Sequence, residues 1–285
     1  MALRIFTNLS SLNSQRAMSI NNARLGTSLE RIATGIRLQR SGDDIGAMSV
    51  SQSLRGDVAA LKQGAKNLND GISMIQTADG ALNEQSGILI RLREITTQSA
   101  TGTIGDTERV SLQLEFSALR SEFDRIANTT EFNSRKLLDG SLAASSSDTT
   151  VLQLGLDSNE NNRLDLNQKI NLTAITSSAL GFSTNSIATD TGAVTAMANL
   201  TTAIDKLSTI RGRVGSALEG LEYSKGALDA NVENLTGAIS TMRDADFAEE
   251  FASMTKNQIL VQGAAAMIGQ ANLIPQSVLT LLQEQ

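Results

Sequence analysis

Apolar residues recur every three and four positions along several long stretches of this chain, which is the pattern of an amphipathic helix. The clearest ladder lies within residues 247–282 and consists of Leu260, Ala264, Met267, Ala271, Ile274, Val278 and Leu281. A second line on the same stretch, at steps of seven, consists of Phe247, Met254, Val261 and Ile268. Such spacing is typical of a coiled-coil seam. We therefore predict a long C-terminal helix that packs against a partner.

This C-terminal ladder is too thin to order the helix without a partner. Burial of a Leu, Ile, Val or Met side chain contributes about 1.5 to 3 kcal/mol, which gives roughly 10 to 20 kcal/mol for the whole ladder. Ordering the backbone costs about 1 to 2 kcal/mol for each of roughly 40 residues. The partner is then either the N-terminal part of the same chain or another copy of it.

Residues 8–38 predict a second amphipathic helix, whose seam mirrors the C-terminal one. Its seam residues, at steps of four, three and four, are Leu25, Leu29, Ile32 and Ile36. Gly35 and Gly42 bracket the expected end of this helix, and the Ser-Gly-Asp-Asp run at 41–44 supplies a stop followed by an N-cap. We expect this seam to pack against the C-terminal helix.

Between these ends the chain predicts three further long helices. Heptads run from Leu54 to Leu89, and residues 99–105, which contain two glycines, break the pattern. Asp106 or Thr107 is expected to cap the next helix, which ends near Asn128. The last of the three carries a seam from Leu200 to Met242.

Arg211 and Lys225 occupy seam positions on the last of these helices. A charged residue in a seam lowers stability and fixes the register of the helices. Alternatively, the long side chains extend along the edge of the seam and keep their charges in water. The sequence leaves both interpretations open.

Residues 140–192 differ in kind. Alternating apolar and polar residues at 151–156 and 163–170 predict a β-hairpin, and residues 183–192 predict an exposed linker. The turn at 157–162 begins like a calcium loop, but Asn162 stands at the glycine position and Gln168 at the position of the final glutamate. We interpret it as a turn and predict no metal site.

Composition excludes several classes of site. The chain has 285 residues, with neither cysteine nor histidine, so a disulfide, a thiol nucleophile, a Cys/His zinc site and an imidazole base are all absent. The net charge of −6 argues against nucleic acid or an anionic membrane as partner. Two pairs of carboxylates lie close together in the sequence, and we interpret them as helix caps rather than as acid/base groups. These residues are Asp43, Asp44, Asp244 and Asp246. We predict no catalytic residue and no cofactor.

The start of the chain lacks the apolar run of a secretory signal peptide, which by itself favours a cytoplasmic protein. Several segments, however, resemble the N-terminal half of bacterial flagellin: 29–37, 41–44, 69–73, 81–84, 91–95 and 132–133. Others resemble its C-terminal half: 234–235, 243–250, 256–260, 270–272 and 275–282. The resemblance covers nearly the whole chain, in order.

The resemblance implies a mainly α fold: a long, coiled-coil-like helix bundle with paired terminal helices and a small β-hairpin region. Residues 1–43 and 244–285 would form an inner polymerisation domain. Residues 44–243 would form a helix-bundle shell with the hairpin at about 150–172 and no large outer domain. The polymerisation seam would comprise Leu25, Leu29, Ile32, Ile36, Phe247, Met254, Val261, Met267, Ile274, Val278 and Leu281. The N-terminal seam would pack on the C-terminal ladder of the same chain, and the line from Phe247 to Ile268 would meet neighbouring subunits.

The function implied by the resemblance is that of a non-enzymatic subunit of the flagellar filament. Such a chain is exported unfolded by the flagellar type III apparatus, which needs no cleaved signal peptide, so an extracellular filament replaces the cytoplasmic expectation. A periplasmic flagellum is the alternative. Implied partners are further copies of the chain, an export chaperone, the cap protein and hook-associated junction proteins. A vertebrate flagellin-sensing Toll-like receptor would contact Arg91, Ile95 and Glu115.

Three other classes of protein share some of these features. A hook-filament junction protein or a spirochaete periplasmic flagellin would share the helical ends. A hydrolase would need serine and carboxylate groups such as Asp43 or Asp244 in a catalytic arrangement. A secreted adhesin or coiled-coil scaffold would form discrete oligomers, whereas a filament subunit forms open polymers.

Overall fold

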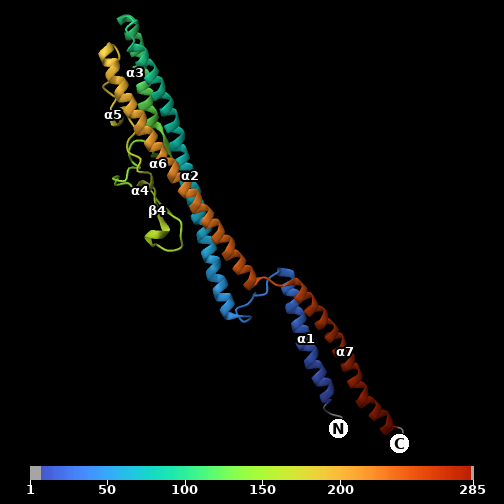
Figure 1. Cartoon of the computed structure of the whole chain (residues 1–285). Helices are drawn as coiled ribbons and strands as arrows, with labels where there is room; N and C mark the ends of the chain where they lie inside the picture. The colour runs from blue at the N-terminus through green and yellow to red at the C-terminus, as the bar shows by residue number, and fades with distance from the viewer. Residues whose placement is uncertain (1–7, 284–285) are drawn as a thin grey trace. The chain divides into compact units, whose positions relative to one another are not determined.

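The computed structural model describes residues 8–283, and side-chain surroundings as far as residue 273. Two compact units make up the fold (Figure 1). Unit 1 combines residues 1–56 with 235–285, and unit 2 spans residues 57–234. The mainly α fold that the sequence predicts is confirmed.

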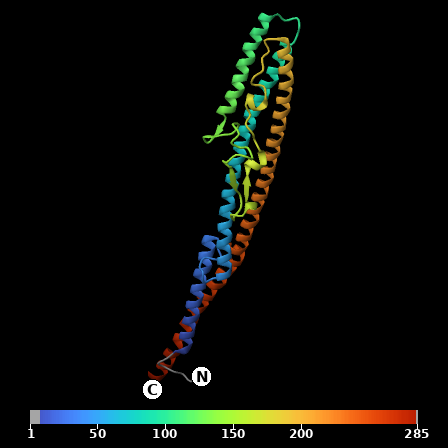
Figure 2. The same ribbon diagram turned by 90° about the vertical axis from the view of Figure 1, so that its left-hand side faces the viewer.

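Long helices dominate unit 2, where α3 (Asp106–Thr129) lies alongside α2 (Ile45–Ser99) and α6 (Asp190–Arg243) (Figure 2). The predicted break after α2 is confirmed. Asp106 is the first residue of α3 rather than its cap, because Gly105 holds the extended N-cap conformation.

The predicted seams of α2 and α6 are largely buried within unit 2, whereas the last part of the α6 seam, from Leu235 to Met242, belongs to unit 1 and is half-buried. The buried residues of the two seams in unit 2 are Val58, Leu61, Leu68, Ile75, Leu82, Leu89, Leu200, Leu207, Val214, Leu221 and Leu228. Arg211 and Lys225 are half-buried beside the α6 seam. Nε of Arg211 lies 3.6 Å from Oδ1 of Asp79 on α2, so this charge has an acidic neighbour at the seam edge.

Two short hairpins lie in unit 2. The predicted one is formed by β3 (Val151–Gln153) and β4 (Arg163–Asp165), with a 3₁₀ turn at Glu160–Asn162. Its second strand is shorter than predicted because Asp165 accepts hydrogen bonds from the backbone N–H groups of Asn167 and Gln168. These bonds begin α4 (Leu166–Ile170).

The other hairpin, β1 (Glu131–Phe132) with β2 (Arg135–Lys136), was not predicted. The predicted linker 183–192 is also corrected. Its Ile187 is fully buried, and the hydroxyl of Ser99 donates to the Ile187 carbonyl at 2.6 Å. A short helix, α5 (Ser177–Leu180), precedes that segment.

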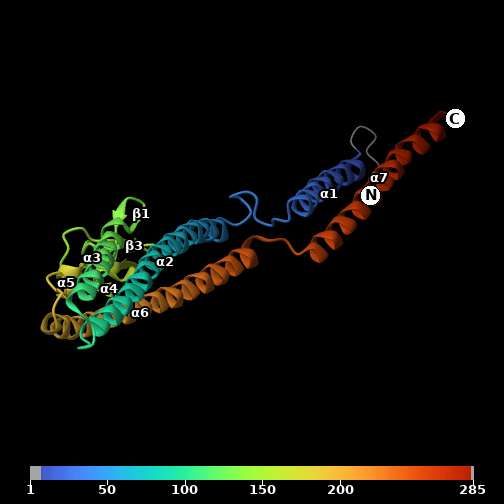
Figure 3. The same cartoon turned by 90° about the horizontal axis from the view of Figure 1, so that it is seen from above.

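Unit 1 is built on α1 (Leu9–Thr34) and α7 (Phe247–Gln283), which pack along their lengths (Figure 3). They are antiparallel, because the amide of Asn8 bonds to Ala271 at one end and Ile36 bridges to Asp244 at the other. α1 ends before residue 38 because Gly35 takes a left-handed conformation, with φ of +69°.

Candidate assembly interface

The face of α1 that packs on α7 follows steps of three and four, but more than half of it is polar. Its buried or half-buried residues are Ser11, Ser14, Met18, Asn21, Leu25, Ser28, Arg31 and Ile32. Small serine side chains let two helix backbones approach closely, although they bury little apolar area. This face alone is therefore a weak source of stability.

The facing side of α7 has the same spacing. Its buried or half-buried residues are Glu250, Met254, Asn257, Val261, Ala264, Ile268 and Ala271. Three large apolar side chains at steps of seven alternate with small or polar ones. The two helices thus share a narrow seam of the coiled-coil type.

The predicted seam residues fall on two different faces. We expected Leu260, Ala264, Met267 and Ala271 to face α1, and the line of Met254, Val261 and Ile268 to face other subunits. The structure places that line toward α1, whereas Leu260 and Met267 are exposed. Only the small members of the ladder, Ala264 and Ala271, lie in the seam.

The remaining members of the predicted polymerisation seam are also divided. Leu25 and Ile32 are half-buried on α1, and Ile36 is half-buried in the link after it. Leu29, expected to face α7, is 49% exposed because its neighbour Ser28 takes the seam position. Phe247 is exposed. The side chains of Ile274, Val278 and Leu281 lie outside the described residues.

Large apolar residues on both helices of unit 1 point into solvent. On α1 and α7 their exposed fractions are 41–66%, and the residues are Leu9, Leu12, Ile20, Leu29, Phe247, Phe251, Ile259, Leu260, Met267 and Leu273. Soluble monomers rarely expose so many large apolar side chains on one small unit, and such surfaces mark sites of association. These ten residues are called the outward apolar rows below.

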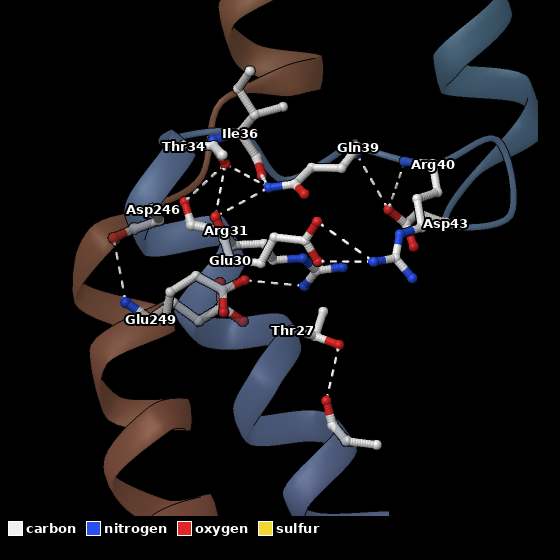
Figure 4. Close-up of polar contacts among 12 residues, drawn as sticks. Thr27, Glu30, Arg31, Thr34, Ile36, Gln39, Arg40, Asp43, Asp246 and Glu249 are labelled. Atoms are coloured by element: carbon white, nitrogen blue, oxygen red, sulfur yellow. Dashed lines mark hydrogen bonds and ion pairs between the residues drawn. The ribbon is translucent and has the colours of Figure 1, made fainter.

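Backbone hydrogen bonds join the end of α1 to the start of α7. Figure 4 shows polar contacts beside this link, among them the hydrogen bonds that Gln39 and Arg40 donate to Asp43. The N–H of Arg37 donates to the Arg243 carbonyl at 2.7 Å, and the N–H of Ala245 donates to the Gly35 carbonyl at 3.0 Å. A guanidinium nitrogen of Arg37 also donates to the Met242 carbonyl at 2.8 Å. These bonds fix where the seam begins.

Of the four carboxylates predicted to cap helices, Asp44 and Asp246 do so. The prediction is wrong for the other two, because Asp43 accepts from backbone N–H groups of the preceding turn and Asp244 accepts from the hydroxyl of Ser240. Asp44 accepts from the N–H of Ala47 at 2.9 Å in the first turn of α2, and Asp246 accepts from that of Ala248 at 2.8 Å. The pKa of Asp43 is lowered, chiefly by the backbone N–H of Arg40 and then by that of Gln39, which both donate to its carboxylate. A carboxylate that accepts such bonds is held in its ionised form.

One ion pair closes the seam beside the link. Nη1 of Arg31 lies 3.0 Å from Oε1 of Glu250, and the side chains of these residues are 27% and 11% exposed. Because the pair is partly buried, loss of one partner would leave a charge in poor contact with water. It therefore favours one pairing of α1 with α7 over others.

The residues proposed for receptor contact lie in unit 2. Nη2 of Arg91 on α2 is 2.8 Å from Oε1 of Glu115 on α3, and both side chains are exposed. The bond to Glu115, followed by the one to Glu94, raises the pKa of Arg91. Ile95 is only 1% exposed and packs in the core, so it is not available for direct contact.

Within the residues that the structure describes, no group of three or more acidic side chains is arranged to hold a metal ion. Over the same residues, no helix has the length and apolar character needed to cross a membrane.

Two family models match this chain. The bacterial flagellin N-terminal helical region matches residues 5–143, and the bacterial flagellin C-terminal helical region matches residues 197–282. Together they span more than half of the chain.

Whole proteins match as well. A flagellin of Halalkalibacterium halodurans is 38% identical, over 97% of this chain and 98% of the relative. A flagellar filament 30.7 kDa core protein of Treponema maltophilum is 36% identical, over 96% of this chain and 98% of the relative. The crystal structure of Bacillus cereus flagellin matches 62% of this chain and 93% of its own, at 32% identity and a TM-score of 0.46.

Proposed function

Because this chain belongs to the bacterial flagellin family, we propose that its copies associate through the outward apolar rows of α1 and α7. The chain is a structural subunit of the flagellar filament, which serves motility, and it is not an enzyme. Its self-association builds that filament. The proposal concerns which residues carry the association.

The observation that best supports this proposal is that α7 has apolar side chains on more than one face. One line packs on α1, and Leu260, Met267 and Leu273 remain exposed on other faces. Burial of each such side chain in a neighbouring subunit would contribute about 1.5 to 3 kcal/mol. When different patches of two copies meet and the rotation between the copies does not close into a ring, association generates an open helical polymer. A coiled-coil scaffold that forms discrete oligomers would not need apolar residues exposed on these other faces of α7.

Replacement of Met267 by glutamate tests the proposal. Met267 is 60% exposed, so the substitution leaves the subunit folded but places a charge where the neighbour would bury an apolar side chain. We expect the critical concentration for polymerisation to rise by about 100-fold or more, which corresponds to roughly 3 kcal/mol. Sedimentation of polymerised material measures that concentration.

The matched control is Gln270→Glu, one turn further along the exposed surface of α7 and with the same change of charge. This variant should polymerise within about threefold of the parent chain, as exposed polar positions usually tolerate substitution. If Met267→Glu polymerised as readily as Gln270→Glu, with helicity of both unchanged by circular dichroism, the outward rows would not be the association surface.

We also propose that the filament lies outside the cell, as the family resemblance implies. Since the chain has no cysteine, Ser147→Cys would introduce a single thiol at an exposed position of unit 2. A membrane-impermeant maleimide should label this thiol on intact cells as fully as on isolated filaments. Labelling that requires permeabilised cells would instead place the filament in the periplasm.

The further partners are proposals that rest on the family resemblance. They are an export chaperone, the cap protein, hook-associated junction proteins and the vertebrate flagellin-sensing Toll-like receptor. The receptor surface would involve the exposed pair Arg91 and Glu115, with Ile95 supporting it from the core. Direct binding of the purified chain to the receptor ectodomain tests this assignment, and a chain that showed no binding would remove it.

A further inference from the structure

One side chain at the start of α1 makes two hydrogen bonds in different directions. Oδ1 of Asn8 accepts from the backbone N–H of Ser11 at 3.1 Å, the ordinary bond of an N-cap. Nδ2 of Asn8 donates to the backbone carbonyl of Ala271 on α7 at 2.7 Å. Asn8 therefore caps its own helix and ties it to the other.

The Ala271 carbonyl is available because of a residue four positions later. In an α-helix each carbonyl accepts from the N–H four residues ahead, which here is residue 275. That residue is the only proline of the chain, and proline has no backbone N–H. Ala271 is 6% exposed, so water has little access to its carbonyl. A buried carbonyl without a donor is costly, and Asn8 supplies the donor.

We propose that Asn8 and Pro275 form a clasp that fixes the start of α1 on α7. The proline removes a donor within α7, and the asparagine amide donates to the acceptor thus freed. The contacts described above between Gly35 and Ala245, and between Arg31 and Glu250, hold the opposite end of the seam. The clasp holds the other end of the seam, where α1 begins. Between these two ends, the small residues of the seam bury little apolar area.

The position of the clasp suggests what it does in assembly, and this step rests on the proposed association surface. Leu9 and Leu12 follow Asn8 on α1, and Met267 and Leu273 flank Ala271 on α7; all four are at least half exposed. Fixing Asn8 on Ala271 holds these side chains together as one surface contributed by two helices. Without the clasp, each helix would present its own row independently.

A double-mutant cycle on the full chain tests the clasp. Asn8→Asp keeps the oxygen that caps α1 but loses the amide donor, and Pro275→Ala restores the N–H that bonds Ala271 within α7. We expect Asn8→Asp to raise the critical concentration about fivefold when Pro275 is present, the effect of losing one hydrogen bond. With Pro275→Ala it should change that concentration by at most about twofold.

Asn8→Ser serves as the uncharged control. It keeps a capping oxygen, and its shorter side chain lacks the amide, so its effect should also depend on Pro275. Equal effects of the Asn8 variants with and without the proline would overturn the clasp, as would no effect with the proline present. So would a Pro275→Ala chain that is helical but does not polymerise, because the proline acts in this proposal only by freeing a carbonyl.

The experiments can reject the proposed clasp and the proposed association surface independently of each other. If Met267→Glu polymerised normally while the cycle still showed coupling, the clasp would stand and the assignment of the outward rows would fall. If Met267→Glu blocked polymerisation and the cycle showed no coupling, the reverse would hold.

Discussion

Removal of residues 247–285 is expected to abolish filament formation while unit 2 stays folded. The deletion removes α7, and with it the partner of the α1 seam and most of the outward apolar rows. The core of unit 2 lies between residues 58 and 228 and keeps all its members. Sedimentation and electron microscopy score the filaments, and circular dichroism with thermal melting scores the fold.

The two readouts separate assembly from folding. Normal filaments from the shortened chain would contradict the role given to α7. A loss of cooperative melting would show that α7 is needed for unit 2 to fold, which would also contradict the assignment. Only a folded chain that stays unassembled supports it.

Replacement of Phe123 by alanine is expected to lower the free energy of unfolding of unit 2 by about 3 to 5 kcal/mol, the usual cost of such a cavity. Phe123 and Phe182 are fully buried, and their rings pack edge to face with centroids 5.3 Å apart. Urea denaturation followed by circular dichroism measures the loss.

Leu114→Ala is the matched control for this substitution. Leu114 lies on the same helix, α3, but is 68% exposed. Its replacement should change the free energy of unfolding by no more than about 0.5 kcal/mol. Equal losses from the two variants would mean that the packing of Phe123 against Phe182 is not what stabilises unit 2.

The sequence predicted unit 2 well because its long helices are amphipathic in the ordinary sense. Along α2, Leu68, Ile75 and Leu82 recur at steps of seven, and each is almost fully buried. When a helix has one apolar stripe, the periodicity identifies both the helix and its packed face.

In unit 1 the same reasoning finds the helices but not their packed faces. α7 carries apolar residues on several faces, and its seam with α1 also contains Asn257. On α1 the serine at position 28 lies inside and the adjacent leucine outside. In a subunit that packs against other copies, an apolar residue is buried either within the subunit or at the contact with a neighbouring subunit. Apolar character alone therefore does not say which row of residues packs on which partner.

The short elements of unit 2 escape prediction for a different reason. β1 and β2 have two residues each, which is too few to show an alternating pattern. Their turn holds Asn133 and Ser134 at positive φ, and Asn is a residue that tolerates this conformation. The Asp165 cap, by contrast, was a readable signal of a helix start within the predicted second strand.

The serine-rich seam between α1 and α7 has a thermodynamic consequence. Ser11 and Ser28 are buried and Ser14 is half-buried at positions where a stable coiled coil would bury large apolar side chains, so the pair contributes little folding free energy in isolation. Anything that binds only the folded form stabilises it by mass action, and neighbouring subunits do so here. The ordering of unit 1 and its incorporation into the filament are then coupled, and the critical concentration reflects both the stability of the helix pair and the contacts with neighbouring subunits.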